Sequence, residues 1–313
     1  MSLVDDTSFP LRLLKAHDYA LIDQFVIGDA LQDIIGIAPD LVPIVPQSME
    51  ADADKFPLLL PLSNLDNDAL QTLFSLLEHA HLEHAALPIV CLFKCAAGVD
   101  SLRNQWMRRM IVQTTRGQKF QLRSYVPSVF VQLQRIYNSG QLKALFDEIE
   151  IWSIYQDHSW QSLRSPDTSP TRYNLIDEIQ LAQLMRVQAI NRTLATFDTQ
   201  KEGGNSNDLS SLTTSRPLYS SSNTTDFFAF STAIDALILR AQRHGLVRED
   251  DQVQFTLHGL TQHPQFDSHP RIQKIIAEMD REEQTYTDVA ALLQPEDWQR
   301  ICNELKAPAF SEA

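Results

Sequence analysis

The stretch Leu87–Lys94, LPIVCLFK, decides the fold class of the first half of the chain. Its apolar run from Leu87 to Phe93 has the length of one buried strand. The run is far shorter than the roughly 20 residues that a membrane-spanning helix needs. We therefore predict a buried strand here and expect no transmembrane segment.

Strand patterns flank this run on both sides. Toward the N-terminus, Tyr19–Ile27 is rich in β-formers and predicts a strand. Two short apolar runs, Leu41–Val45 and Leu58–Leu62, lie among prolines, which favours sheet edges or extended connections. Toward the C-terminus, the predicted elements are a hairpin of Ile111–Thr114 and Lys119–Tyr125 that turns at Arg116 and Gly117, and a closing strand at Glu148–Tyr155.

Helical patterns lie between these strands. Asp66, Asn67 and Asp68 offer a cap and acidic first-turn residues to a helix whose apolar face begins at Leu70. Further helices are predicted around Leu102–Met110 and from Pro127, which suits a first helical position. The second half is helical throughout, with predicted helices at Tyr173–Phe197, Phe230–Ala241, Pro270–Met279 and Pro295–Leu305. We expect Gly245 to end the second of these helices in the left-handed conformation.

The segment Thr199–Asp226 interrupts the helical half. Seventeen of its 28 residues are Ser, Thr, Asn or Gly, which predicts a flexible linker or loop. The fold prediction is therefore α+β. A mixed α/β lobe with a small sheet occupies residues 1–165, and an all-α lobe occupies residues 166–313 and contains the flexible segment 199–226.

Charge is distributed unevenly along this acidic chain, whose formal net charge is −14. Between Ser101 and Leu145 there are eight basic residues and no acidic one, which leaves 18 basic and all 40 acidic residues to the rest. Such a segment either pairs internally or presents a positive face to an acidic partner. Nucleic acid is disfavoured as a partner because the remainder of the chain repels phosphate.

Histidines are the main candidates for catalysis or metal binding. His79, His81 and His84 form HAHLEH at the end of the first predicted helix, but His79 points away from the other two, and zinc needs three or four ligands. His258, His263, Asp267 and His269 precede Pro270, where Asp267 or Ser268 suits a helix cap. Glu249, Asp250 and Asp251 suggest a solvated turn. We expect structural roles for these residues, with no metal and no cofactor, and keep a metal-dependent or hydrolytic enzyme as the alternative.

The cysteines and the first residues of the chain indicate the cellular compartment in which the protein works. The chain has three cysteines, Cys91, Cys95 and Cys302, an odd and sparse set that favours reduced thiols in a reducing compartment. The opening MSLVDDTSFP has neither the basic nor the apolar region of a signal peptide. We therefore expect a cytoplasmic protein.

The segment Gln113–Trp160 resembles the core of a known family. An arginine pair, Arg108 and Arg109, precedes the predicted hairpin, and RSYVP at Arg123–Pro127 follows it. Tyr19–Asp23, YALID, resembles the first strand of the same family. The family is that of the type VI secretion effector adaptors, long described as a domain of unknown function. Four further residues match the family pattern, and the resemblance implies that they form its structural motif: Tyr125, Pro127, Phe146 and Trp152. At Val126 the family typically has Asp.

The resemblance implies a non-enzymatic bacterial adaptor or chaperone with protein partners. Such an adaptor binds a toxic effector and helps to load it onto the VgrG spike of the secretion machine. The basic segment is the candidate partner-binding surface, and its residues are Arg103, Arg108, Arg109, Arg116 and Arg123. A toxin or immunity protein of the same system is a further alternative.

Overall fold

The computed structural model describes residues 11–24, 30–38, 40–82, 87–156, 159–203, 224–279 and 284–306. The chain divides into two compact units, Met1–Leu181 and Ala182–Ala313, which we call unit 1 and unit 2. Unit 1 contains a six-stranded antiparallel sheet with helices, and the described part of unit 2 is helical. The predicted α+β fold class is therefore confirmed.

The six-stranded sheet of unit 1 has the strand order β2-β3-β1-β4-β7-β8, and all neighbours are antiparallel. Its strands are β1 (Tyr19–Ile22), β2 (Val42–Pro43), β3 (Leu58–Pro61), β4 (Ile89–Cys95), β7 (Ile149–Gln156) and β8 (Ser159–Arg164). The quoted run at residues 87–94 thus supplies an interior strand, β4, whose apolar side chains are buried on both faces of the sheet.

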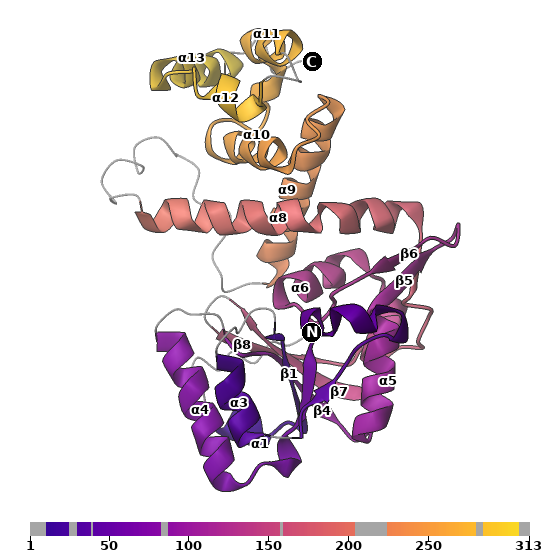
Figure 1. The fold of residues 1–313 in the computed structure, drawn as a ribbon. Helices are drawn as coiled ribbons and strands as arrows, with labels where there is room; N and C mark the ends of the chain where they lie inside the picture. Colours follow the sequence, from indigo (N-terminus) through magenta and orange to yellow (C-terminus); the bar gives the residue numbers. More distant parts are fainter. Residues whose placement is uncertain are drawn as a thin grey trace. The chain divides into compact units, whose positions relative to one another are not determined.

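Helices cover both faces of this sheet, as Figure 1 shows for α3 and α4 on one side and α5 on the other. One face packs against α1 (Leu11–Lys15), α3 (Ala30–Ile37) and α4 (Asn67–Leu82) through an aliphatic core. The other face carries an aromatic cluster of Phe93, Trp106, Phe130, Phe146 and Trp152. Its helices are α5 (Val99–Arg109), α6 (Pro127–Ile136) and α7 (Ser139–Phe146).

Several predicted elements of unit 1 have different bounds in the structure. β1 ends at Ile22 because Asp23 leaves the ladder and pairs its carboxylate with Arg123. The run at Leu58–Leu62 forms β3, which lies inside the sheet and not at its edge, since its prolines stand at the strand ends. Asp66 caps α4 as predicted, and its Oδ1 accepts from the backbone N–H of Ala69 at 2.8 Å. The 3₁₀ helices η1 (Gln47–Lys55) and η2 (Leu62–Asn64) flank β3.

A second, three-stranded sheet has the order β6-β5-β9. The predicted hairpin forms from β5 (Ile111–Thr114) and β6 (Lys119–Gln121), and Gly117 in its turn has φ 84°. β9 (Leu175–Ile176) lies parallel to β5, so the chain returns to this hairpin before it enters α8 (Glu178–Gly203). The helix predicted at Tyr173–Phe197 therefore begins at Glu178, after the cap formed by Asp177, whose Oδ1 accepts from the Gln180 N–H at 2.7 Å.

Unit 2 is built from α8 onward. Its helices are α9 (Thr224–Arg243), α10 (Glu249–Thr261), α11 (Pro270–Glu278), α12 (Tyr286–Ala290) and α13 (Pro295–Lys306), with the 3₁₀ helix η3 (Phe266–Ser268). One core joins α8, α9 and α10, and a second joins α10, η3, α11, α12 and α13. Gly245 ends α9 with φ 77°, as predicted. Glu249, Asp250 and Asp251 form the first turn of α10 and not a solvated turn, because negative side chains suit a helix N-terminus.

Part of the predicted flexible segment 199–226 lies outside the described residues, namely 204–223. Its first residues end α8 and its last residues open α9. No helix in the described part of the chain combines the length and the apolar character needed to cross a membrane.

Candidate functional site

The basic segment Ser101–Leu145 folds into α5, β5, β6, α6 and most of α7. Its cations have three kinds of environment. Arg109 is buried, Arg103 and Arg123 bond to other parts of unit 1, and Arg108, Arg116 and Lys119 are exposed. Both alternatives drawn from the charge pattern, internal pairing and an exposed positive face, therefore occur within one segment.

Arg109 does not belong to a surface. Its side chain is 1% exposed, and its Nη2 donates to the carbonyl of Phe146 at 2.9 Å and to Gln105 Oε1 at 3.2 Å. The guanidinium also lies 5.2 Å from the ring centroid of Trp106. Burial lowers the pKa of Arg109 to about 10. We therefore correct the prediction: Arg109 ties α5 to the end of α7 and is not available to a partner.

Arg123 links the two ends of the sequence motif. Its Nη2 donates to Asp23 Oδ2 at 2.6 Å, and its Nε donates to the hydroxyl of Tyr125 at 2.8 Å. Asp23 is 1% exposed, whereas the Arg123 side chain is 36% exposed. YALID and RSYVP, which lie a hundred residues apart, thus meet in one ion pair that fixes the end of β1 against the turn before α6. Arg123 is thus engaged in an internal ion pair, and its role in partner binding stays a prediction.

Sequence reasoning missed Asp23 as the partner of Arg123. An acidic residue directly after a strand of buried apolar residues was the available signal, because a buried carboxylate requires a cation. Arg103 likewise bonds within unit 1, since its Nε donates to the carbonyl of Pro43 in β2 at 2.9 Å.

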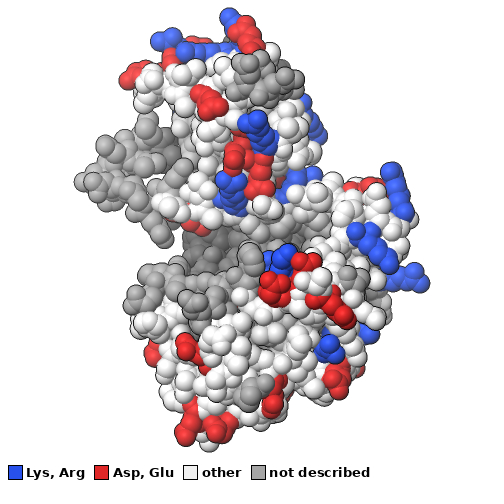
Figure 2. All heavy atoms as spheres, in the orientation of Figure 1, with Lys and Arg blue, Asp and Glu red and all other residues white. Residues whose placement is uncertain are grey.

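The exposed cations gather at the β5–β6 hairpin. Arg108 lies in the last turn of α5, just before β5, Arg116 lies in the turn, and Lys119 opens β6. We call these three residues the basic hairpin. In Figure 2, Lys and Arg side chains project from the part of unit 1 that Figure 1 labels β5 and β6. Arg116 pairs with Glu178 at 3.2 Å in an exposed ion pair, and Arg108 and Lys119 make no ion pair with any described residue. An exposed ion pair is worth little, so Arg116 can exchange Glu178 for an acidic partner.

Three of the four motif residues lie in the interior of unit 1. Tyr125, Phe146 and Trp152 are each at most 2% exposed. Trp152 stacks on Phe130 with ring centroids 4.1 Å apart, and burial raises the pKa of Tyr125 to about 12. Pro127 is the first residue of α6, and the preceding Val126 provides no side-chain cap. These side chains hold the helices on the sheet.

The described candidate histidines lie apart from one another in hydrogen bonds that hold the fold together. His81 bonds to the hydroxyl of Tyr155, and His84 lies outside the described residues. His258 Nδ1 bonds to the Tyr286 hydroxyl at 2.8 Å. His269 Nδ1 accepts from the N–H of Arg271 at 3.2 Å, so His269 caps α11 in place of the predicted Asp267 or Ser268. In the described residues, no three His, Cys, Asp or Glu side chains form a group that could hold a metal.

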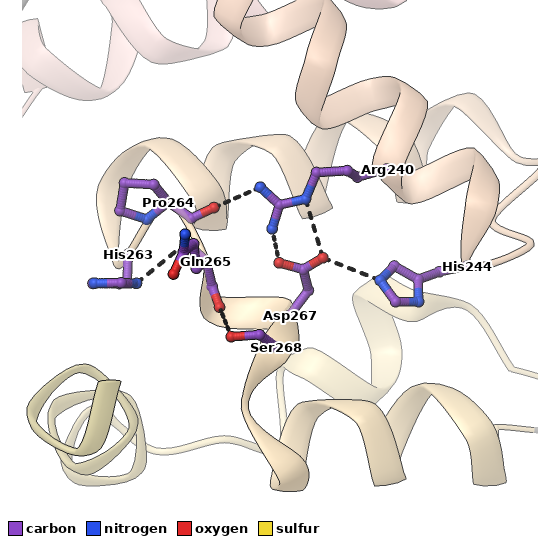
Figure 3. Close-up of polar contacts among 7 residues, drawn as sticks. All are labelled: Arg240, His244, His263, Pro264, Gln265, Asp267 and Ser268. Carbon is purple, nitrogen blue, oxygen red and sulfur yellow. Dashed lines mark hydrogen bonds and ion pairs between the residues drawn. The ribbon is translucent and has the colours of Figure 1, made fainter. Parts of the chain in front are cut away.

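Asp267 joins α9 to η3 inside unit 2 (Figure 3). Its carboxylate pairs with Arg240 and accepts from His244 Nε2 at 3.1 Å. Arg240 also donates to the carbonyl of Pro264 at 2.7 Å. His263 lies on the same loop, where its Nδ1 accepts from the N–H of Gln265 at 3.2 Å. These bonds hold the loop after α10 against the C-terminal end of α9.

Part of unit 1 matches a known family model. Residues 18–144 match a family model described as "Domain of unknown function (DUF4123)". The match covers less than half of the chain. It includes β1, Asp23, the basic hairpin and RSYVP, and it ends before Phe146 and Trp152. No curated protein and no solved structure matches the chain.

Proposed function

We propose that the chain is a non-enzymatic adaptor that binds a toxic effector of a type VI secretion system and helps to load it onto the VgrG spike in the bacterial cytoplasm. The family match at residues 18–144 supports this proposal, because the resemblance of RSYVP and YALID points to the same family. The ion pair between Asp23 and Arg123 joins these two segments, so the matched residues form one structural unit.

The basic hairpin is the surface through which we expect unit 1 to hold an acidic partner. Arg116 and Lys119 are exposed on a short hairpin that pairs with β9 on one side, and Arg108 is exposed in the last turn of α5, beside the buried Arg109. Exposed cations on one part of the surface suit electrostatic steering, which raises association rates and orients the partner.

Affinity capture of the tagged chain from its native cells tests the proposal. A VgrG-type spike protein and a large toxin-like protein in near-stoichiometric amounts are the expected result of mass spectrometry. A chain that is recovered without either protein contradicts the adaptor role. Stoichiometric zinc, iron or nickel in the purified chain would favour the metal-dependent enzyme instead.

A charge-reversal pair then tests the surface. The double variant Arg108→Glu and Lys119→Glu should weaken binding of the captured partner by at least about tenfold while the thermal midpoint stays unchanged. Lys274→Glu with Arg300→Glu, which changes two cations of unit 2 by the same amount, is the matched control. Equal affinity in the two double variants removes the basic hairpin from the partner surface.

A further inference from the structure

Asp251 differs from the other buried carboxylates in the described part of the chain. Asp23, Asp235 and Asp267 are each at most 8% exposed, and each pairs with an arginine. Asp251 is 4% exposed and pairs with no described cation. Its Oδ1 accepts from the N–H and the hydroxyl of Thr287 at 3.2 and 3.4 Å, and its Oδ2 accepts from no described residue. Buried carboxylates normally have a cation beside them, so the charge of Asp251 is left uncompensated.

Asp251 lies in the wall of a cleft of unit 2 that α8, α10 and α12 enclose. The cleft has a volume of about 470 Å³, which is within the range of sites for small organic ligands. Beside Asp251 its wall includes the buried apolar side chains of Val253 and Leu257. It also includes three threonines, Thr196, Thr285 and Thr287, whose hydroxyl oxygens have lone pairs for hydrogen bonds. A ligand in this cleft therefore meets one carboxylate, an apolar wall and several hydroxyls.

Two arginines line the same cleft, but neither compensates Asp251. The guanidinium of Arg192 is held by two other acidic residues, Glu249 at 3.4 Å and Asp250 at 2.5 Å. Arg248 is exposed at the N-cap of α10, where water screens its charge. The N-terminus of α10 itself supplies only about half an elementary charge, and three acidic side chains share it. The cleft therefore lacks a full positive charge at Asp251.

We propose that this cleft binds an alkylammonium group, with the ammonium on Asp251 and the alkyl chain against Val253 and Leu257. A guanidinium fork bonds best to both oxygens of a carboxylate, and Oδ1 of Asp251 already holds both bonds from Thr287. A compact ammonium needs only Oδ2 and directs its other N–H groups to hydroxyl oxygens. A lysine side chain of another protein and a free diamine share this chemistry. The site does not rest on the adaptor role proposed above.

Calorimetric titration of the purified full chain tests the proposal with small probes. Nα-acetyl-lysine methylamide and cadaverine carry the alkylammonium group. The corresponding norleucine compound keeps the alkyl chain without the ammonium, and the arginine compound carries a guanidinium. We expect saturable binding of an amine, with the norleucine and arginine compounds at least about tenfold weaker. Binding of the lysine compound supports a protein side chain as the natural ligand, and binding of cadaverine alone supports a free diamine.

A pair of variants assigns the binding to Asp251. Asp251→Asn keeps an acceptor for Thr287 and removes the charge, so it should weaken binding of the amine at least about tenfold. Glu278→Gln removes one negative charge from an exposed position of α11 in the same unit and should bind as the wild type does. Equal affinity of the two variants overturns the proposal.

Amide chemical shifts of the wild type decide the matter if Asp251→Asn lowers the thermal midpoint. The amides of Asp251, Thr285 and Thr287 should shift when the amine is added and stay in place with the norleucine compound. The proposal is overturned if neither amine binds, if the norleucine or arginine compound binds as tightly, or if these three amides do not shift. The assay uses the purified chain, so its outcome is independent of whether affinity capture finds a spike or a toxin-like protein.

Discussion

Arg108 and Arg109 are adjacent in the sequence and have opposite environments. Arg108 is exposed, and Arg109 is buried against Trp106 and the carbonyl of Phe146. The charge pattern alone does not separate them. Helix periodicity does, because Leu102, Trp106 and Arg109 stand at i, i+4 and i+7 and so share the buried face of α5. The sequence therefore contained the signal for burial, but not the identity of the carbonyl that receives the guanidinium.

The first prediction concerns these two arginines. Arg109→Ala leaves the buried carbonyl of Phe146 without its donor and should lower the free energy of unfolding by about 1–3 kcal/mol. Arg108→Ala removes an exposed side chain and should change it by less than about 0.5 kcal/mol. Urea unfolding of the two variants and the wild type measures both. Equal loss of stability in the two variants contradicts the assignment.

Val126 is the residue at which RSYVP departs from the pattern of the family that it resembles. It stands at the N-cap of α6 with extended backbone angles and no side-chain acceptor. Val126→Asp places a carboxylate at the N-cap of α6, where the positive end of the helix dipole favours a negative charge. We expect the free energy of unfolding to rise by about 0.5–2 kcal/mol. Val126→Ala is the control, because it removes the same side chain without adding a cap, and chemical unfolding should rank Asp above Ala.

Several elements followed from the sequence, and others did not. β4, β7, α4, α6, α11 and α13 have strong periodicity or clear start signals, and the structure contains them. α10 was not predicted because Gln252–Leu257 alternates polar and apolar residues, which is the pattern of a strand. Burial on two sides, against α9 and against η3, overrides that pattern. β8 was not predicted either, because its sequence SWQSLR has no clear strand pattern. It forms a strand because it pairs with the neighbouring β7.

Gly259 sets the approach of α10 to α9. A Cβ atom at this position would lie 2.6 Å from Cδ2 of Leu237 in α9. Gly259→Ala should therefore lower the free energy of unfolding by about 1–3 kcal/mol through overpacking. Gly36→Ala in α3, where a Cβ meets nothing within 4 Å, should raise it by about 0.5–1 kcal/mol through helix propensity. Thermal and urea unfolding measure both variants. Relative to the wild type, Gly259→Ala should be less stable and Gly36→Ala more stable, although the two substitutions are chemically identical.

At the scale of the whole molecule, the two units have separate cores and separate sensitivities to acid. His258 in unit 2 packs against Trp298 and Tyr286, and burial lowers its pKa to about 4. His17 in unit 1 is shifted in the same direction, also by burial. A histidine with a lowered pKa stays neutral in the folded chain while the unfolded chain takes up a proton.

The resulting prediction concerns acid. The stability contributed by neutral His258 is complete above about pH 6.5 and is lost as the pH falls toward 4. The loss amounts to at most about 3 kcal/mol, since each pKa unit corresponds to 1.36 kcal/mol. Unfolding of wild type and His258→Gln between pH 7 and pH 4.5 should show a steeper decline for the wild type. Parallel declines would mean that other groups control the acid response.

The parallel pairing of β9 with β5 also determines when unit 1 can be finished during synthesis. β1 emerges first but lies inside the sheet, where it needs β4, and β4 in turn needs β7. The hairpin that carries the exposed cations is completed only when Leu175 and Ile176 return to it. A ribosome must therefore expose more than half of the chain before unit 1 is complete. Until β7 emerges, one edge of β4 has no partner strand, and a chain truncated before residue 175 leaves its second sheet without its third strand.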